Sequence, residues 1–377
     1  MVCNKLFRGE KMEEKIKVLA KTIVNHSIKV KEGENVKITS ETMEPMPLIK
    51  ELVKLINERG ANVDVSFFDP SLRAMINKDT SDKKIELLKE MEKFEVEKFD
   101  SFIRIFCNQG DYIEALVPDS INVKIGDALK EYRDIRVNEK KWVLLNYPSK
   151  VDSFKAKMGI EEFSEFSFSA MCYDYDQMSK DLEPLKKLME KTDKVRLTGV
   201  GTDITFSIKD IPVIPCTGEA NIPDGEVYTA PVKESVNGVI RYNTPSPYRG
   251  NVYSHVTLEF KNGKIINATC DEDDKALNEI FDTDEGARFV GEFSIGTNPM
   301  IRYPMGDILF DEKIIGSIHF TPGAAYKDAY NGNSSAIHWD MVLIQREDFG
   351  GGNIYFDDVL IRENGVFVID ELKHLNK

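Results

Sequence analysis

The sequence lacks the features that mark membrane-bound and disulfide-stabilised proteins. No apolar run approaches the ~20 residues that a membrane-spanning helix needs, and the N-terminal stretch MVCNKLFRGEKMEEK has no hydrophobic segment typical of a signal peptide. The five cysteines are widely scattered and include no CxxC pair, which supports neither a disulfide framework nor a cysteine-rich zinc site. We therefore expect a cytoplasmic protein with no membrane partner and with reduced thiols at Cys3, Cys107, Cys172, Cys216 and Cys270.

An excess of positive charge is also missing. The formal net charge is -14, and no cluster of Lys and Arg with interleaved aromatic residues reverses it locally. Such a charge opposes binding to a phosphate backbone, so we expect no nucleic-acid partner. What is present, 41% hydrophobic and 30% charged residues, is the balance of a folded globular protein. Because single cores rarely grow past ~250 to 300 residues, a chain of 377 residues is expected to form two domains.

The first half of the chain alternates between helical and extended patterns. The segment from residue 12 onward has the spacing of one helical face, with apolar side chains at Ile16, Leu19, Ala20 and Ile23. The residues before Met12 show no periodicity, which raises the hypothesis that Met12 rather than Met1 is the native start. A second helical stretch ends at Gly60, where a glycine favours a left-handed C-cap. Strands are expected at 36–39, 63–67, 102–106 and 143–146.

This alternation predicts the fold class, α/β. Strands that alternate with helices are typical of a parallel sheet, so residues 1–190 are predicted to form a mostly parallel α/β domain. From residue 191 the pattern changes to short β-like runs separated by Gly, Pro and Asn-Gly turns, at 195–198, 204–208, 252–260 and 264–269. We therefore expect a β-richer α+β domain over 191–377, with a boundary that one sequence places only to within several residues.

Two of the five histidines occur in patterns that suit a metal site. His338 lies in the β-like run SSAIHWDMVLI, where residues two apart share a face, so His338 and Asp340 point the same way. An imidazole and a carboxylate held close together suit borderline divalent ions such as Zn, Co or Mn. A hydrogen-bonded pair at the end of a sheet is the alternative. His319 ends another β-like run, KIIGSIHF, and its alternative is a satisfied core histidine.

Two glutamates occur where a solvated charge is not the first expectation. Glu226 follows a turn in NIPDGEVYTAP, and Glu292 lies among apolar residues and glycines in ARFVGEFSIGTNP. Burying an unpaired carboxylate costs several kcal/mol, so an inward Glu needs a cation, a metal or a proton. A salt bridge to an ordinary cationic partner such as Arg288 is the alternative to metal binding.

These segments, in this order, resemble the aminopeptidase T and aminopeptidase S family, also called the thermophilic metalloprotease family. The stretches that carry the resemblance are NIPDGEVYTAP, GARFVGEFSIGTNP, GSIHFTPGAAY and SSAIHWDMV, with looser likeness in VNHSIKVKEGENV, WVLLNYP and AKMGIEEFSEFSF. The resemblance implies a metal-dependent aminopeptidase that acts on peptides, holds two divalent metal ions (Zn, Co, Mn or Mg) and forms a homodimer. The metal ligands that it implies are Glu226, Glu292, His319, His338 and Asp340, with Tyr326 ligating or leaning over the pair. The segment between His319 and His338 is shorter than in the family, which leaves substrate preference open.

The expected mechanism follows from two ions about 3.5 to 4 Å apart, which can share a water, lower its pKa toward ~7 and stabilise an oxyanion. Glu292 is the predicted bridge, because a strand would hold it rigidly. Tyr326 is predicted to donate a hydrogen bond to the oxyanion if it is not a ligand, and packing is the alternative. The α-amine of the substrate would be recognised either by one metal or by a carboxylate such as Glu219.

Two other functions stay open at this point. The same ligands would serve a two-metal hydrolase of another amide or ester, which would differ only in the shape of its pocket. They would also serve a non-catalytic, metal-stabilised protein whose N-terminal domain binds a small molecule. Open metal coordination separates an enzyme from a purely structural metal site.

Overall fold

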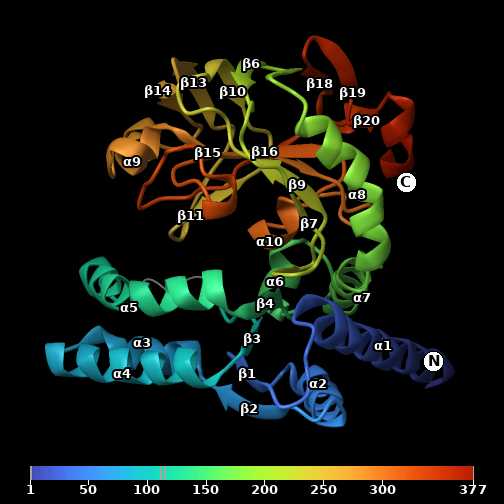
Figure 1. Ribbon diagram of the computed structural model, residues 1–377, viewed down its shortest axis with the longest axis vertical. Coiled ribbons are helices and arrows are strands. Elements are labelled where there is room, and N and C mark those ends of the chain that lie inside the picture. Colours follow the sequence, from blue (N-terminus) through green and yellow to red (C-terminus); the bar gives the residue numbers. More distant parts are fainter. Residues whose placement is uncertain (1, 111–112, 114–115, 377) are drawn as a thin grey trace. The chain divides into compact units, whose positions relative to one another are not determined.

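The chain forms two compact units in the computed structural model, which describes residues 2–110, 113 and 116–376 (Figure 1). The first unit comprises Met1–Tyr173 with Gly218–Pro223, and the second comprises Asp174–Thr217 with Asp224–Lys377. Helix α8 (Tyr175–Met189) therefore groups with the second unit. The domain boundary expected after residue 190 concerns independently folding regions and stays a prediction.

A parallel sheet forms the centre of the first unit. Its strand order is β2-β1-β3-β4-β8, and every neighbouring pair is parallel. The strands are β1 (Asn35–Ser40), β2 (Asn62–Phe67), β3 (Ser101–Phe106), β4 (Lys141–Asn146) and β8 (Asn221–Ile222). The first four cover the runs expected from the sequence. The predicted α/β class with a parallel N-terminal sheet is therefore confirmed.

Helices cover both sides of this sheet. Figure 1 shows α1 and α2 on one side and α3, α4 and α5 on the other. The helices are α1 (Val2–Thr22), followed by a π-helical turn (Ile23–Ser27), α2 (Met46–Glu58), α3 (Pro70–Lys78), α4 (Asp82–Lys98), α5 (Asp119–Glu139), α6 (Lys150–Lys155) and α7 (Ile160–Met171). Spacing of i, i+4 and i+8 places Leu48, Leu52 and Ile56 of α2 on one fully buried face. Gly60 has a φ of +71, as the expected left-handed C-cap requires.

The second unit contains two antiparallel sheets and a small hairpin. The larger sheet has the order β14-β13-β10-β6-β5-β18-β19-β20, and the smaller one has the order β17-β16-β15-β9-β7. The larger sheet consists of β5 (Lys194–Gly199), β6 (Thr202–Ser207), β10 (Asn237–Arg241), β13 (Thr257–Lys261), β14 (Lys264–Thr269), β18 (Gly352–Phe356), β19 (Val359–Glu363) and β20 (Val366–Phe367). The smaller sheet consists of β7 (Ile214–Cys216), β9 (Glu226–Thr229), β15 (Val290–Gly296), β16 (Ser317–Pro322) and β17 (Val342–Ile344). The hairpin is β11 (Ser246–Tyr248) with β12 (Asn251–Tyr253), and the helices are α8, α9 (Asp274–Phe281) and α10 (Ile308–Asp311).

The two faces of the smaller sheet differ in chemistry because side chains alternate along a strand. One face of β15 and β16 carries Phe293 and Phe320, which pack against Phe206 of β6 with ring centroids 5.0 Å apart in each case. Figure 1 shows these strands beside the larger sheet. The opposite face carries Glu292 of β15 and His319 of β16. The apolar face anchors the sheet, and the polar face is left to build a site.

Some expected strands are broken in the structure. The predicted run 252–260 is two strands, because His255 between them has a φ of +50, which a regular strand does not allow. The run around His338 is also not a continuous strand, since His338 forms only an isolated bridge with Gly323 and β17 begins at Val342. Both corrections arise from backbone geometry that hydrophobic alternation does not report.

The expectations about cysteines and about membrane-spanning helices can be compared with the described residues only. The cysteines whose side chains the structure describes, Cys107, Cys172, Cys216 and Cys270, form no disulfide. The side chain of Cys3 and the residue Met1 lie outside the described part of the chain. Among the described residues, no helix combines the length and apolar character that crossing a membrane requires.

Candidate metal centre

Three neighbouring strands of the smaller sheet bring acidic and imidazole side chains together. Glu226 is the first residue of β9, Glu292 lies in β15, and His319 lies in β16. The antiparallel register pairs Glu226 with Gly296 and Ser294 with His319. All three side chains are buried, with residue exposures of 4% for Glu226, 3% for Glu292 and 1% for His319. Such burial of two carboxylates requires compensating groups.

His319 lies between the two glutamates. Its Nε2 atom donates to Glu292 Oε1 at 3.0 Å, and its Nδ1 atom is 3.4 Å from Glu226 Oε2. The Nδ1 atom is buried and has no hydrogen-bond partner within the described structure. Ligand atoms of Glu226, Glu292 and His319 all lie within 4.8 Å of one another, close enough to hold one cation.

A second group of three shares Glu292. His338 Nε2 is 3.3 Å from Glu292 Oε2 and 3.3 Å from Asp340 Oδ1. The Nδ1 atom of His338 donates to the backbone oxygen of Ala324 at 2.8 Å, which leaves Nε2 to face the carboxylates. This Nε2 atom is another buried nitrogen that has no hydrogen-bond partner among the described residues. The two oxygens of Glu292 therefore face different histidines.

Hydroxyl groups and a tight loop hold these ligands in place. Ser294 Oγ donates to Glu226 Oε2 at 2.8 Å, and Thr321 Oγ1 donates to Asp340 Oδ1 at 2.6 Å. The loop that leads to His338 is pinned by fully buried Asn333, whose Nδ2 atom donates to the backbone of Gly323 at 2.7 Å. Gly323 has a φ of +109, and a Cβ there would lie 2.1 Å from the backbone oxygen of Ile337, so only glycine fits.

The pKa values in the site reflect two opposing effects, burial of the charged groups and pairing between opposite charges. Burial disfavours the charged carboxylate of Glu292, but the neighbouring imidazoles of His319 and His338 outweigh it and lower the pKa of Glu292. Asp340 responds in the same way, its pKa lowered by charged His338 despite burial. Burial also opposes protonation of His319, yet Glu226 and Glu292 raise its pKa to about 10. Without a metal, the imidazoles therefore carry the positive charge that the carboxylates need.

The structure adds two residues that the sequence analysis missed, Glu312 and Lys313. Ligand atoms of Glu312, His319 and Asp340 lie within 4.8 Å of one another. Burial raises the pKa of Glu312 to about 8 despite the neighbouring Lys313 ammonium. The signal was present in ILFDEKIIG, where a charged triplet interrupts an apolar run.

Lys313 also corrects the partner expected for a buried glutamate. Its Nζ atom donates to Glu226 Oε1 at 2.8 Å, and its side chain has 0% exposure. Arg288, the ordinary partner considered from the sequence, instead pairs with Asp282 at 2.7 Å. Sequence proximity pointed to Arg288, whereas the pairing is decided by the fold, which brings residue 313 next to β9.

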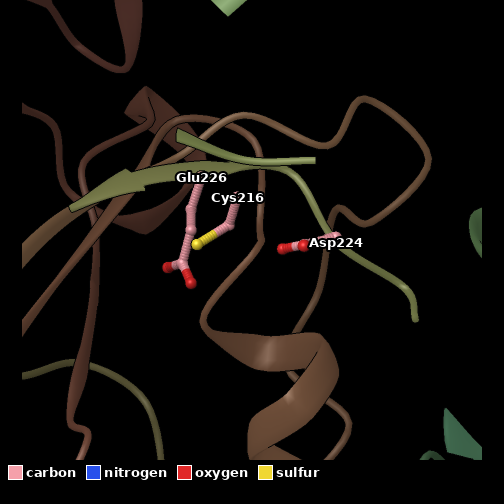
Figure 2. Close-up of side chains that lie close together, drawn as sticks. All are labelled: Cys216, Asp224 and Glu226. Carbon is pink, nitrogen blue, oxygen red and sulfur yellow. The ribbon is translucent and has the colours of Figure 1, made fainter. Parts of the chain in front are cut away.

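Another acidic group lies beside Glu226. Figure 2 shows Glu226 and Cys216 pointing to the same side from neighbouring strands, with Asp224 turned toward them from the segment before β9. Their ligand atoms lie within 4.8 Å of one another. Burial raises the pKa of the Cys216 thiol well above its usual value, so the thiol carries its proton when no metal is bound.

The remaining predicted site residues are placed differently. The ring of Tyr326 lies 4.7 Å from the His338 ring and 5.8 Å from the Tyr228 ring, measured between centroids. Tyr326 therefore leans over His338, and burial raises the pKa of its phenol well above the usual value. Glu219 belongs to the segment grouped with the first unit, where its Oε1 atom is 3.8 Å from His26 Nε2. Its predicted role in binding an amine stays a prediction.

The donor set fits divalent cations. The buried nitrogens His319 Nδ1 and His338 Nε2 have no hydrogen-bond partner among the described residues, and each faces a carboxylate. Mixed ligation by imidazole and carboxylate suits borderline metals. The sequence profile of the thermophilic metalloproteases (M29) matches residues 12–367. This chain belongs to the thermophilic metalloprotease (M29) family. The resemblance noted from the sequence is thereby confirmed, and this M29 chain is a metal-dependent hydrolase of the peptidase class.

Relatives of this M29 chain carry aminopeptidase names. It is 24% identical over 373 residues to aminopeptidase AmpS of Bacillus subtilis, covering 88% of this chain and 90% of that protein. It is 31% identical over 153 residues to aminopeptidase T of Thermus thermophilus, covering 36% of this chain and 37% of that protein.

Solved structures share the fold over nearly the whole length. Wild-type AmpT from Thermus thermophilus superposes with a TM-score of 0.77 at 19% identity, covering 94% of this chain and 99% of that one. A 2,5-dihydroxypyridine dioxygenase from Pseudomonas putida superposes with a TM-score of 0.62 at 14% identity, covering 96% and 99%. At these identities the two likenesses establish the mixed α/β fold alone.

Proposed function

We propose that this M29 chain is an aminopeptidase whose centre holds two divalent cations bridged by Glu292. The observation that carries the proposal is the sharing of Glu292 between two ligand groups, with one oxygen facing His319 and the other facing His338. A carboxylate placed in this way fits between two cations. The names of the relatives in Bacillus and Thermus support the aminopeptidase activity.

The proposed ligands divide into two halves. Glu226, Glu292 and His319 would hold one cation, and Glu292, His338 and Asp340 would hold the other. Bound divalent ions supply Lewis acidity toward a carbonyl and lower the pKa of water. The chain itself orients the ligands through Ser294, Thr321 and the backbone of Ala324.

Other residues act on the substrate rather than on a cation. Tyr326 is proposed to donate its phenolic proton in a hydrogen bond to the oxyanion, because its raised pKa keeps the hydroxyl protonated. Recognition of the substrate amine stays open between a cation and a carboxylate such as Glu219. The imidazole and carboxylate donors favour Zn, Co or Mn, whereas Mg prefers sites made of oxygen donors alone.

A direct test uses aminoacyl-p-nitroanilides after chelation and after separate addition of Zn, Co, Mn or Mg. We expect chelation to stop release of p-nitroaniline and at least one ion to restore it. A blocked substrate, N-acetyl-leucine p-nitroanilide, should resist cleavage because an aminopeptidase requires the free amine. Equal turnover of blocked and free substrates would contradict exopeptidase action, and activity that survives complete metal removal would contradict the centre.

Variants of the bridge and of one histidine test the ligand assignment. Glu292→Ala and His338→Ala should each lower turnover by more than about 100-fold, since even outer-shell partners of a metal are worth about 10 to 100-fold. His255→Ala is the matched control, because His255 pairs with Asp271 on the surface and is half exposed. Circular dichroism should show all three variants folded. Turnover within a few-fold of wild type in either ligand variant would refute the assignment.

We also propose a homodimer, which follows from the family resemblance, and a cytoplasmic location, which follows from the lack of a hydrophobic signal segment in the sequence. Size-exclusion chromatography with light scattering measures the first, and fractionation of native cells measures the second. A monomer at assay concentration would contradict the homodimer and leave the proposed metal centre unaffected.

A further inference from the structure

A buried ammonium group lies at one end of the ligand cluster. The Lys313 side chain has 0% exposure, and its Nζ atom is 2.8 Å from Glu226 Oε1 and 3.9 Å from Asp224 Oδ1. It also forms an ion pair with Glu312 Oε1. The group of Cys216, Asp224 and Glu226 seen in Figure 2 therefore already has a cation, and this cation is part of the chain.

The backbone around Lys313 keeps the ammonium in this position. The peptide N–H of Lys313 donates to Phe310 at 3.0 Å, and its carbonyl accepts from the N–H of Asn298 at 3.0 Å. The side chain of fully buried Asn298 donates to the backbone oxygen of Asp224 at 2.7 Å, so one residue ties both sides of the ion pair together. The Lys313 ammonium itself cannot move into solvent without breaking its buried hydrogen bonds to Glu226 and Glu312.

The ammonium affects the two halves of the centre unequally. Glu226 Oε1 is already occupied by Lys313, and Oε2 accepts from Ser294 and faces His319. A cation bound beside His319 would share a carboxylate with a positive charge and be repelled by it. Within the described part of the chain, by contrast, no Lys or Arg lies within ion-pair distance of Glu292 or Asp340.

We propose that the Lys313 ammonium is a built-in cation of the centre that makes its two halves unequal in affinity. The divalent ion at Glu226, Glu292 and His319 is the weaker and more readily exchanged one. The ion at Glu292, His338 and Asp340 is the tighter one. This inference rests on the two-cation centre of the proposed function and adds an order to its loading.

The test measures bound cobalt per chain by mass spectrometry after equilibrium dialysis against buffered free Co²⁺. Wild type should load in two steps separated by at least tenfold in free Co²⁺. Lys313→Met, whose side chain is unbranched, one atom shorter and uncharged, should load its weaker step at a free Co²⁺ at least tenfold lower. Its tighter step should move less. Lys275→Met, at a side chain that is 87% exposed, is the matched control and should reproduce the wild-type curve.

The possible outcomes separate this inference from the proposed function. A Lys313→Met curve that superposes on wild type, or one in which both steps move equally, overturns the inference and leaves the centre intact. Wild type that takes up no cobalt overturns the proposed function, and the inference falls with it. Wild type that takes up one ion while Lys313→Met takes up two supports the inference.

A second pair of variants keeps the test decisive if Lys313→Met fails to fold. His319→Ala should remove the weaker step and leave the tight one near its wild-type position. His338→Ala should remove the tight step and leave only weak binding. The reverse order would place the tight ion beside Lys313 and overturn the inference.

Discussion

The imidazoles of His319 and His338 determine how the centre responds to protons. His319 has a pKa of about 10 in the metal-free protein because Glu226 and Glu292 outweigh the effect of burial. The pKa of His338 is likewise raised, since Asp340 outweighs its burial. Both rings therefore carry their protons at neutral pH when no metal is bound. A nitrogen that ligates a metal cannot keep its proton, so metal and protons compete for the same atoms.

Metal uptake should consequently release protons at neutral pH. Isothermal titration calorimetry in buffers of different ionisation enthalpy should detect release of between one and two protons per chain. Because raised pKa values stabilise the protonated form, the apparent metal affinity should rise as pH increases from neutrality toward about 10 and fall as pH decreases. Heats that do not depend on the buffer would show that neither histidine exchanges a proton for a metal.

Tyr326 gives a prediction that separates a catalytic role from packing. If its hydroxyl donates to the oxyanion, Tyr326→Phe should lower kcat by about 10² to 10³, the usual value of one oxyanion donor, with little change in KM. The free energy of unfolding should hardly change, because the substitution removes only the hydroxyl and keeps the ring that packs on Tyr228 and His338. Unaltered kcat would assign Tyr326 to packing against His338.

At the scale of elements, the centre depends on close packing between β15 and the segment that carries Lys313. Gly296 faces Glu226 across the sheet, and a Cβ at this position would lie 2.4 Å from the backbone oxygen of Ile314. Gly296→Ala should therefore lower the free energy of unfolding by about 1 to 3 kcal/mol, as overpacking does.

Urea denaturation of Gly296→Ala measures this cost against a glycine with free space. A Cβ at Gly126 in α5 would meet nothing within 4 Å, so Gly126→Ala should raise stability by about 0.5 to 1 kcal/mol. Opposite signs for the two variants are expected. A neutral Gly296→Ala would show that the strand can move away from the Lys313 segment.

Elements were predictable where one local rule governs them. The β-like run that ends at His319 and the apolar segment around Glu292 favoured strands, and the structure contains β16 and β15 there. The run around His338 followed the same alternation, but the left-handed Gly323 and the isolated bridge replace the expected strand. Lys313 was not predictable by such rules, because its partners Glu226 and Asp224 meet it only through folding. Resemblance to the family supplied the order of the ligands, which periodicity alone does not provide.

On the scale of the whole molecule, the centre belongs to one compact unit. Among the described residues, every member of the four groups of possible metal ligands lies in the second unit. Family membership over residues 12–367 nevertheless spans both units. The family match therefore covers the parallel sheet of the first unit as well as the antiparallel sheet that carries the candidate centre.

The central claim is that Glu292 bridges two cations, and a crystal structure with bound zinc tests it most directly. Anomalous difference data should show two zinc peaks per chain, each at about 2.0 to 2.2 Å from a different oxygen of Glu292, the usual distance between zinc and a carboxylate oxygen. One peak should lie beside His319 and the other beside His338. A single peak, or two peaks of which one lies beyond bonding distance of Glu292, would contradict the account.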